Sequence, residues 1–245
     1  MLQGLYAAAS GMEAQQNQFN AISNDLANLN TAGYRATDVG FQDMLYSTAG
    51  PAASGTTVAT GTGASSWIVG RSQAEGSLQT TGNPLDVAIQ GDGFLQVRRS
   101  NGSIGLTRNG TLQVDAKGQL TDSQGNPIVP PINVPAGFDS SNLKILSNGD
   151  VLAGTKKLGT IQAVTVPAPN QLLPDGASLF SVTTASGATR TATGSTIHQG
   201  MLEGSNVDAG AAMSQLITSE RAYQMSSQAI QYQDQMLQIA DQLRK

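Results

Sequence analysis

Residues 2–29 read LQGLYAAASGMEAQQNQFNAISNDLANL, and this stretch decides the fold. Its larger apolar side chains recur in alternating steps of three and four, the spacing of an α-helix that packs against other helices. No proline interrupts the pattern, and Gly33, after Asn28 and Asn30, is expected to end the helix in a left-handed conformation. The seam consists of Leu2, Leu5, Ala9, Met12, Phe19 and Leu26, with Gln16 and Ser23 counted as its polar members and Ile22 and Leu29 widening it.

A second helix is expected over residues 205–245, where Ser205 and Asp208 can cap its start. It carries two apolar stripes at heptad or three-four spacing, and a helix that is apolar on two sides is buried on two sides. The pair of helices can pack within one chain or on pairs from neighbouring copies, and the double stripe favours the second arrangement. The first stripe is Met213, Leu216, Tyr223, Ile230 and Leu237; the second is Met225, Ala229, Tyr232, Met236, Ile239 and Leu243.

The segment between the helices divides by composition. Residues 47–66 carry no charge and consist mostly of Gly, Ala, Ser and Thr, which cannot build a core and indicate an extended or flexible connector. The sequence therefore predicts an α+β protein, with a central all-β domain flanked by terminal helices that pair into a coiled-coil-like helical domain. The expected parts are the N-terminal helix (1–33), a connector (34–80), the β domain (81–185), a second connector (186–204) and the C-terminal helix (205–245).

Turn signals support strands in the middle of the chain. Apolar-rich stretches at 86–89 and 94–97 flank Gly91-Asp92-Gly93, which we interpret as a hairpin turn rather than a phosphate-binding loop, because the last glycine and the following helix of that motif are missing. Further hairpin turns are expected at Asn101-Gly102, Asn109-Gly110 and Asn148-Gly149.

Composition excludes several function classes. The chain of 245 residues has no cysteine, a single histidine (His198), 12% charged residues and a formal net charge of −4. These values argue against nucleic-acid binding, disulfides and thiolate metal sites, and no motif supplies a nucleophile with its base. We expect no enzyme activity, no cofactor, no metal and no small-molecule substrate. The first residues also lack a secretory signal, so any export is expected to use another route.

Three motifs resemble one family. The stretch Leu5–Met12 with Ser23–Arg35 resembles the N-terminal signature of bacterial flagellar rod and hook proteins. Pro84–Phe94 and Thr107–Asp115 are similar to that family's central domain, and Leu202–Asp208 with Ile217–Tyr223 is similar to its C-terminal end. The likeness covers nearly the whole chain in order.

The resemblance implies a structural subunit of the flagellar rod, the drive shaft that carries torque from motor to hook. It implies a helical homopolymer held by the terminal helices, located in the basal body outside the cytoplasmic membrane. The implied partners are other rod and hook subunits, the ring proteins that act as a bushing and the flagellar type III export apparatus. The residues expected to mediate self-assembly are Leu5, Met12, Phe19, Ile22, Leu26, Asn28, Gly33 and Tyr34 in the N-terminal part, and Met213, Leu216, Tyr223, Ile230 and Leu237 in the C-terminal helix.

Within the family, Val39–Tyr46 and the chain length most resemble the distal rod protein. Two features depart from it: Leu112 replaces the usual Phe, and the segment after Tyr46 is shorter. A proximal rod protein or another hook–basal-body relative is therefore an alternative. From a different class, a cell-wall carbohydrate-binding β module would need an exposed aromatic platform, whereas Phe94, Phe138 and Phe180 occupy expected core positions.

Overall fold

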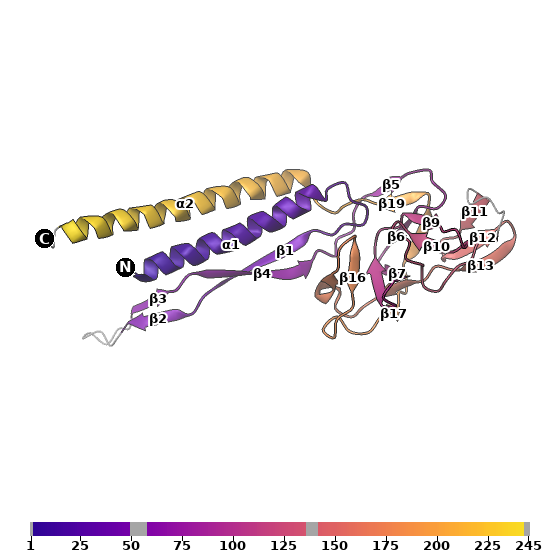
Figure 1. The fold of residues 1–245 in the computed structure, drawn as a ribbon, viewed down its shortest axis with the longest axis horizontal. Coiled ribbons are helices and arrows are strands. Elements are labelled where there is room, and N and C mark those ends of the chain that lie inside the picture. The colour runs from indigo at the N-terminus through magenta and orange to yellow at the C-terminus, as the bar shows by residue number, and fades with distance from the viewer. Residues whose placement is uncertain (1, 50–57, 136–141, 243–245) are drawn as a thin grey trace. The chain divides into compact units, whose positions relative to one another are not determined.

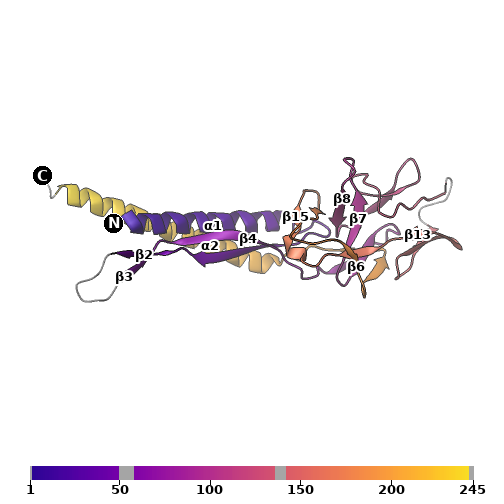
Figure 2. The same cartoon turned by 90° about the horizontal axis from the view of Figure 1, so that it is seen from below.

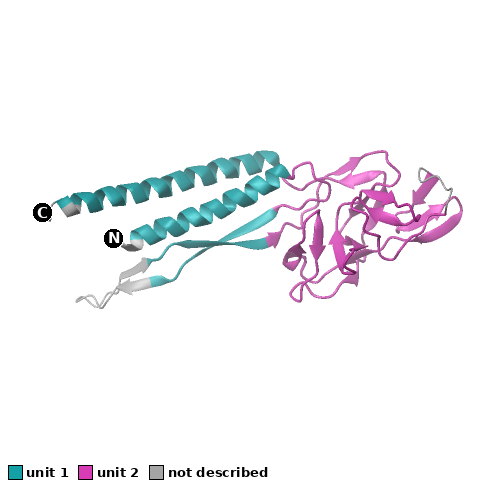
Figure 3. Ribbon diagram, viewed as in Figure 1, with its two compact units in different colours: residues 1–27, 37–69, 208–245 teal, residues 28–36, 70–207 magenta. Residues whose placement is uncertain are grey.

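The computed structural model describes residues 2–49, 58–135 and 142–242. By their contacts, the residues fall into two units, coloured separately in Figure 3. Unit 1 comprises residues 1–27, 37–69 and 208–245, and unit 2 comprises residues 28–36 and 70–207. Helices flank a β-rich central region in the chain, which confirms the predicted α+β class.

Unit 1 is built on two long helices, α1 (Leu2–Ala27) and α2 (Ala209–Gln242). They run side by side in opposite directions (Figures 1 and 2). Asp208 caps the start of α2, because its carboxylate Oδ1 accepts the Ala211 amide at 3.0 Å, as the sequence indicated. The first helix ends at Ala27, before the predicted end at residue 33, and Asn28 begins a turn in which its carbonyl accepts the Thr31 amide at 3.1 Å.

Paired strands complete unit 1. Strand β1 (Thr37–Asp43) pairs with β4 (Ala64–Arg71), and β2 (Tyr46–Ala49) pairs antiparallel with β3 (Val58–Gly61). The β1 strand packs against α1, and the carboxylate of Asp25 accepts the Thr37 amide and hydroxyl at 3.0–3.1 Å. The expected connector over 34–80 is thus extended but paired, because backbone pairing needs no large side chains. Part of it, residues 50–57, lies outside the described residues.

Unit 2 is a set of small antiparallel sheets. The largest has six strands in the order β15-β16-β8-β7-β14-β17, and β11, β12 and β13 form a second, three-stranded sheet. Pairs β18-β6, β19-β5 and β10-β9 complete it. The elements are β5 (Leu78–Thr80), β6 (Val87–Gln90), β7 (Phe94–Arg98), β8 (Ile104–Thr107), β9 (Leu112–Val114), β10 (Leu120–Asp122), β11 (Leu143–Ile145), β12 (Asp150–Ala153), β13 (Lys156–Thr160), β14 (Ala163–Thr165), η2 (Pro169–Gln171), β15 (Leu173–Pro174), β16 (Leu179–Ser181), β17 (Arg190–Thr191), β18 (Thr196–Gln199) and β19 (Met201–Glu203).

Two of the predicted hairpin turns are confirmed and two are wrong. Asn101-Gly102 joins the paired strands β7 and β8, and Asn148-Gly149 joins β11 and β12. Asn109-Gly110 separates β8 from β9, which pairs with β10 instead. Gly91–Gly93 separates β6 from β7, and these strands pair with β18 and with β8 and β14 respectively. A glycine-rich turn marks a bend in the chain, but it does not specify which strands pair.

The second predicted connector is also structured. Residues 186–204 contain β17, β18 and β19, which pair with β14, β6 and β5. Ile197 in β18 is buried in the main core of unit 2, and Glu203 in β19 is 1% exposed. Short strands of Thr and Gln carry little periodicity, so composition alone presented them as linker.

The core of unit 2 has two clusters of buried side chains. The larger includes Leu95, Leu112, Leu120, Ile132 and Ile161. The smaller contains Phe94 and Phe180, whose ring centroids lie 5.9 Å apart in an edge-to-face arrangement. Both phenylalanines are core residues as expected, and Phe138 lies outside the described residues.

Among the described residues, neither helix has the length and apolar character needed to cross a membrane. The same residues contain no group of three or more His, Cys, Asp or Glu side chains arranged to hold a metal ion. His198 is hydrogen-bonded through Nε2 to Gln90 Oε1 at 2.8 Å.

Candidate functional site: a helix pair and a junction hub

The two helices of unit 1 approach closely where α1 carries glycine. A Cβ atom built on Gly4 would lie 2.4 Å from Nε2 of Gln233, and one built on Gly11 would lie 3.9 Å from Oγ of Ser226. Gly4 and Gly11 are seven residues apart on α1, and their partners Gln233 and Ser226 are seven residues apart on α2. The residue numbers rise along α1 and fall along α2, as expected for an antiparallel heptad contact. The glycines therefore allow α2 to approach the backbone of α1.

A groove opens between the helices further along. It encloses about 330 Å³, and Phe19 and Leu216 are its main apolar residues. Polar side chains on both sides leave it open to solvent rather than sealed. Its lining consists of Gln15, Gln16, Phe19, Leu216, Ser219, Glu220 and Tyr223.

The N-terminal residues expected to mediate assembly lie partly inside unit 1. Ile22 is buried and Leu5, Met12, Phe19 and Leu26 are half-buried. Two members of the predicted seam, Ala9 and Gln16, are exposed, and the side chain of Leu2 lies outside the described residues. The contact with α2 is thus shifted around the helix towards Gly4 and Gly11, which a search for large apolar residues does not find.

The two stripes of α2 have different environments. On the first, Leu216 and Ile230 are half-buried, whereas Tyr223 and Leu237 are about 40% exposed and Met213 is 54% exposed. The described large residues of the second stripe lie mostly in solvent. Their exposed fractions are 67% for Met225, 63% for Tyr232, 57% for Met236 and 56% for Ile239, and Leu243 lies outside the described residues.

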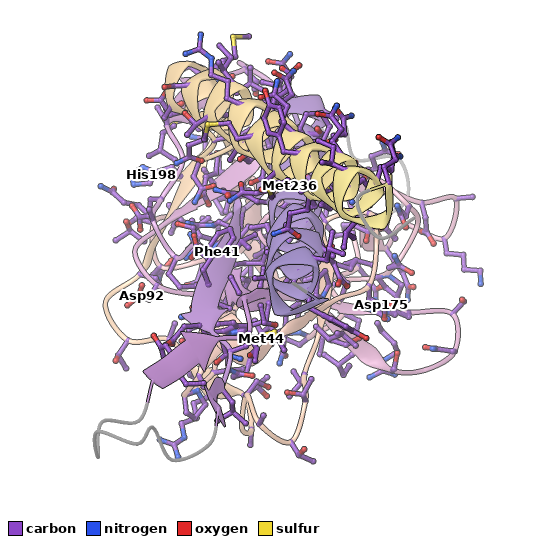
Figure 4. All side chains as sticks on the ribbon, turned by 90° about the vertical axis from the view of Figure 1, so that its left-hand side faces the viewer. Phe41, Met44, Asp92, Asp175, His198 and Met236 are labelled. Carbon is purple, nitrogen blue, oxygen red and sulfur yellow. The ribbon has the colours of Figure 1, made fainter. Side chains whose placement is uncertain are left out.

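The strands of unit 1 also expose apolar side chains. Figure 4 labels Met236 on α2, and Phe41 and Met44 on and just after β1. Leu45 is 89% exposed and Ile68 is 69% exposed. The other exposed members of this hairpin surface are Tyr46, Trp67 and Val69. Large apolar side chains exposed in such number on a few strands are typical of an interaction site.

Unit 2 contains a second cluster, which is ionic and buried. Glu203 lies between two arginines: its Oε1 is 2.7 Å from Nη2 of Arg35, and its Oε2 is 3.1 Å from Nη1 of Arg108. All three side chains are at most 4% exposed. Burial lowers the pKa of the Arg35 guanidinium, Glu203 opposes this shift, and Arg108 adds to it.

Both arginines also donate Nη–H groups to backbone carbonyls, whereas their buried Nε atoms have no hydrogen-bond partner. Arg35 donates through Nη1 to the carbonyl of Ala74. Arg108 donates to the carbonyls of Ile89 at 3.3 Å and Gly91 at 2.8 Å, and its guanidinium lies 5.4 Å from the centre of the Phe94 ring. The carboxylate of Glu203 accepts a further bond from the Gly76 amide at 3.0 Å.

Three more polar residues surround this triad. Arg71 donates to the hydroxyl of Tyr34 and to the carbonyl of Arg35, both at 2.9 Å, and stacks on the Tyr34 ring at 5.2 Å. Asn206 accepts the Ala36 amide at 2.7 Å and donates to the carbonyl of Ala74 at 2.9 Å. We call Tyr34, Arg35, Arg71, Arg108, Glu203 and Asn206 the junction hub.

Gly33 adjoins the hub and needs its glycine. Its amide donates to the carbonyl of Glu203 at 2.8 Å, and its φ is +67°. A Cβ atom would lie 2.5 Å from the backbone carbon of Arg108 and the amide nitrogen of Asn109. The left-handed conformation was predicted correctly, but its role as the end of the helix was wrong. Gly33 lies six residues beyond Ala27, where the chain passes close to another loop.

Sequence reasoning placed Tyr34 among the site residues but missed Arg35, Arg108 and Glu203 as a unit. Each lies within one of the three motifs that carry the family resemblance. The signal available was charge, because only 12% of the chain is charged, so each arginine or glutamate inside a motif is a candidate for a specific contact. Their separation along the chain hides the pairing.

Comparisons with known proteins agree with this arrangement. Residues 5–35 match the family described as flagella basal body rod protein, residues 88–153 match the flagellar hook protein FlgE/F/G D1 domain, and residues 198–243 match the flagellar basal body rod FlgEFG protein C-terminal region.

Relatives match over nearly their full length. The flagellar basal-body rod protein FlgG of Buchnera aphidicola subsp. Acyrthosiphon pisum is 34% identical over 262 residues, covering 99% of this chain and 100% of the relative. FlgG of Caulobacter vibrioides is 36% identical over 263 residues, with 99% and 100% covered. The rod protein FlgF of Escherichia coli K12 is 33% identical over 253 residues, with 98% and 97% covered. The chain therefore belongs to the flagellar basal-body rod protein family and is a structural subunit of the flagellar rod.

Proposed function

We propose that this rod subunit polymerises through unit 1, and that the resulting shaft transmits torque from the motor to the hook. Among the described residues of unit 1, the buried side chains are Ala14, Ile22, Asp25, Ala212 and Ser219. Only Ile22 is a large apolar residue. A unit with so little core of its own gains most of its stability by packing against other molecules.

Exposed apolar surface supports the same proposal. Of the large apolar residues that are exposed within the described ranges, all but five lie in unit 1. The second stripe of α2 carries the proposal: Met225, Tyr232, Met236 and Ile239 are each more than half exposed. They lie about 100° around the helix from the side that contacts α1, so one subunit can bind its own α1 and a neighbour at once.

The position in the rod and the partners are proposed on the names of the relatives. FlgG proteins predominate among the relatives, which supports the distal rod over the proximal rod. Other rod and hook subunits are proposed as partners because the matching family models are named for rod and hook proteins. The ring proteins and the flagellar export apparatus are proposed only because the family resemblance implies them. The carbohydrate-binding alternative is not favoured, because Phe94 and Phe180 are buried and the exposed large apolar residues described in unit 2 include no aromatic one.

The test places one charge on the second stripe. Met236→Asp puts a carboxylate where a neighbour is proposed to pack, and an unpaired buried carboxylate costs several kcal/mol in each contact of the polymer. We expect exported, folded subunits that form no rods. The helix pair within the subunit should be unaffected, because Met236 is 57% exposed.

Gln231→Asp is the matched control, since Gln231 is an exposed residue of the same helix that lies nearly opposite Met236. It should assemble as the wild-type subunit does, judged by electron microscopy of basal bodies and by motility. Normal rods from the Met236 variant would contradict the proposed contact. Loss of rods in both variants would attribute the defect to charge on α2 in general and would also contradict it.

A further inference from the structure

The chain passes between the two units four times, at 27/28, 36/37, 69/70 and 207/208. On the unit 2 side, each crossing lies within a few residues of a hub contact. Residues 28–36 contain Gly33, Tyr34 and Arg35, residues 70–76 contain Arg71, and residues 203–207 contain Glu203 and Asn206. All four crossing segments are therefore held within unit 2 by one connected network.

This network is directional. Glu203 uses its two carboxylate oxygens on two different arginines, and each arginine uses its remaining Nη donors on carbonyls of further segments. Charge-assisted bonds from a planar guanidinium specify distance and angle, whereas apolar contacts are non-directional. The hub thus specifies the course of the crossing segments relative to the sheets of unit 2.

Stability alone is a weak reason to bury such a triad. Removing three charges from water carries a large desolvation penalty, and apolar replacements of similar volume are often equally stable or more so. The triad also carries one excess positive charge, which Glu75 and Asp92 offset from outside it. Glu75 is itself fixed, because its Oε1 accepts the Gly91 amide at 2.6 Å. A geometric role accounts for the charges better than a stabilising one.

We propose that Arg35, Arg108 and Glu203 are positioning residues for rod assembly: they set the directions in which the four segments leave unit 2. A helical polymer repeats the same subunit geometry at every step, so an error in these directions accumulates along the shaft. This inference goes beyond the proposed helix contacts and does not depend on which surface of unit 1 meets a neighbour.

Glu203→Gln is the first test, because it keeps the size of the side chain and an oxygen for the Gly76 amide while removing the charge between the arginines. We expect amide hydrogen exchange to become about tenfold faster at Gly33, Ala36 and Gly76, which donate into the network, with little change in the β7–β8 and β12–β13 hairpins. Exported subunits should then form few or irregular rods. Asp175→Asn is the control, since it removes an exposed carboxylate, paired with Arg99, from the same unit.

A second variant separates position from stability. Arg35→Met, Arg108→Met and Glu203→Leu together make the hub apolar, and we expect unit 2 to melt at or above the temperature of Glu203→Gln while rods remain defective. If this apolar triple variant forms wild-type rods, the charges are not needed to direct the four crossing segments and the inference is overturned. Wild-type exchange and rods in Glu203→Gln would overturn it as well.

If Glu203→Gln fails to fold, the triple variant alone still tests whether the charges are needed for rod assembly. The two proposals can be distinguished by experiment. Normal rods from Met236→Asp together with defective rods from the hub variants would contradict the proposed contact of the second stripe and would support the hub inference.

Discussion

At the scale of single residues, Gly33 is under two independent constraints. Its φ of +67° disfavours any side chain, and a Cβ atom would lie 2.5 Å from backbone atoms of Arg108 and Asn109. Gly82 has a similar φ of +73° but no atom within 4 Å of an added Cβ. Comparing substitutions at the two glycines therefore distinguishes the cost of the left-handed conformation, which both share, from the cost of the steric clash, which only Gly33 has.

We predict that Gly33→Ala destabilises unit 2 more than Gly82→Ala does. Gly82→Ala should cost about 1–2 kcal/mol, the penalty for a left-handed residue with a Cβ, and Gly33→Ala should add the cost of moving the Arg108–Asn109 backbone. Thermal or urea unfolding of the two variants measures both values. Equal losses of stability would show that the backbone around Gly33 yields without cost.

Asp150 provides a pH-dependent contribution to unit 2. Lys157 Nζ and Thr160 Oγ1 both lie 2.6 Å from its carboxylate, and hydrogen bonds from these groups lower the pKa of Asp150 below the usual 3.8. A depressed folded-state pKa contributes stability that is present above the unfolded-state value and is lost as the pH falls through the folded-state value.

We therefore predict that Asp150→Asn is less stable than the wild type at neutral pH, and that the difference shrinks once the pH falls below about 3.8. Melting temperatures of both proteins across this range give the measurement. A difference that stays constant down to the lowest pH would mean that the ionised carboxylate contributes nothing specific.

At the scale of elements, the helices could be predicted and their exact contact could not. The heptad spacing identified both helices, and Asp208 was recognised as a cap because capping chemistry is local. The contact of α1 with α2 is shifted towards Gly4 and Gly11 because the strands of unit 1 cover another side of α1. Strand pairing depends on such long-range packing, which periodicity in one segment does not contain.

Leu216 tests the helix pair. Leu216→Asp places a carboxylate beside Phe19 in the groove, and because Leu216 is only half-buried we expect a loss of about 1–3 kcal/mol, seen as reduced helix content and failed assembly. Gln224→Asp should be much milder, since Gln224 is exposed and loses one hydrogen bond to Glu220. Circular dichroism measures the helix content and motility measures assembly. Wild-type values for the Leu216 variant would show that Leu216 does not contribute to the packing of the helix pair.

Trp67 reports on the strands of unit 1. It is the only tryptophan of the chain and is 46% exposed, next to other exposed apolar residues of the hairpin surface. If this surface packs against neighbours in the rod, tryptophan emission should shift to shorter wavelength on polymerisation, because water is excluded from the ring. Identical spectra for subunits and rods would place this surface outside the subunit contacts.

At the scale of the whole molecule, the sequence indicated the order of parts but misplaced their limits. Composition suggested that the β domain ends near residue 185, whereas β18, β19 and Glu203 belong to unit 2. Residues 28–36 also belong to it, although they follow α1 directly. Both corrections arise from the junction hub, where Arg108 and Glu203 pair across 95 residues of chain.

Limited proteolysis of the isolated subunit should reflect these limits. Since unit 1 has few buried side chains, we expect protease to remove its residues and leave a fragment that begins near Gly70 and ends near Val207. Mass spectrometry of the resistant fragment locates its ends. A C-terminal boundary before β18, near residue 190, would contradict the assignment of β18 and β19 to unit 2.

The central claim is that the second stripe of α2 contacts neighbouring subunits, and the absence of cysteine from the chain makes it directly measurable. Met236→Cys introduces a single thiol on the stripe, and Gln231→Cys introduces one nearly opposite on the same helix. After each thiol is labelled with a maleimide photo-cross-linker, which reacts with any side chain beside it on irradiation of the assembled rods, we predict covalently linked subunits from the Met236 variant and far fewer from the Gln231 variant. Rods in which the Met236 thiol remains unlinked, or links no more than the Gln231 thiol, would contradict the account.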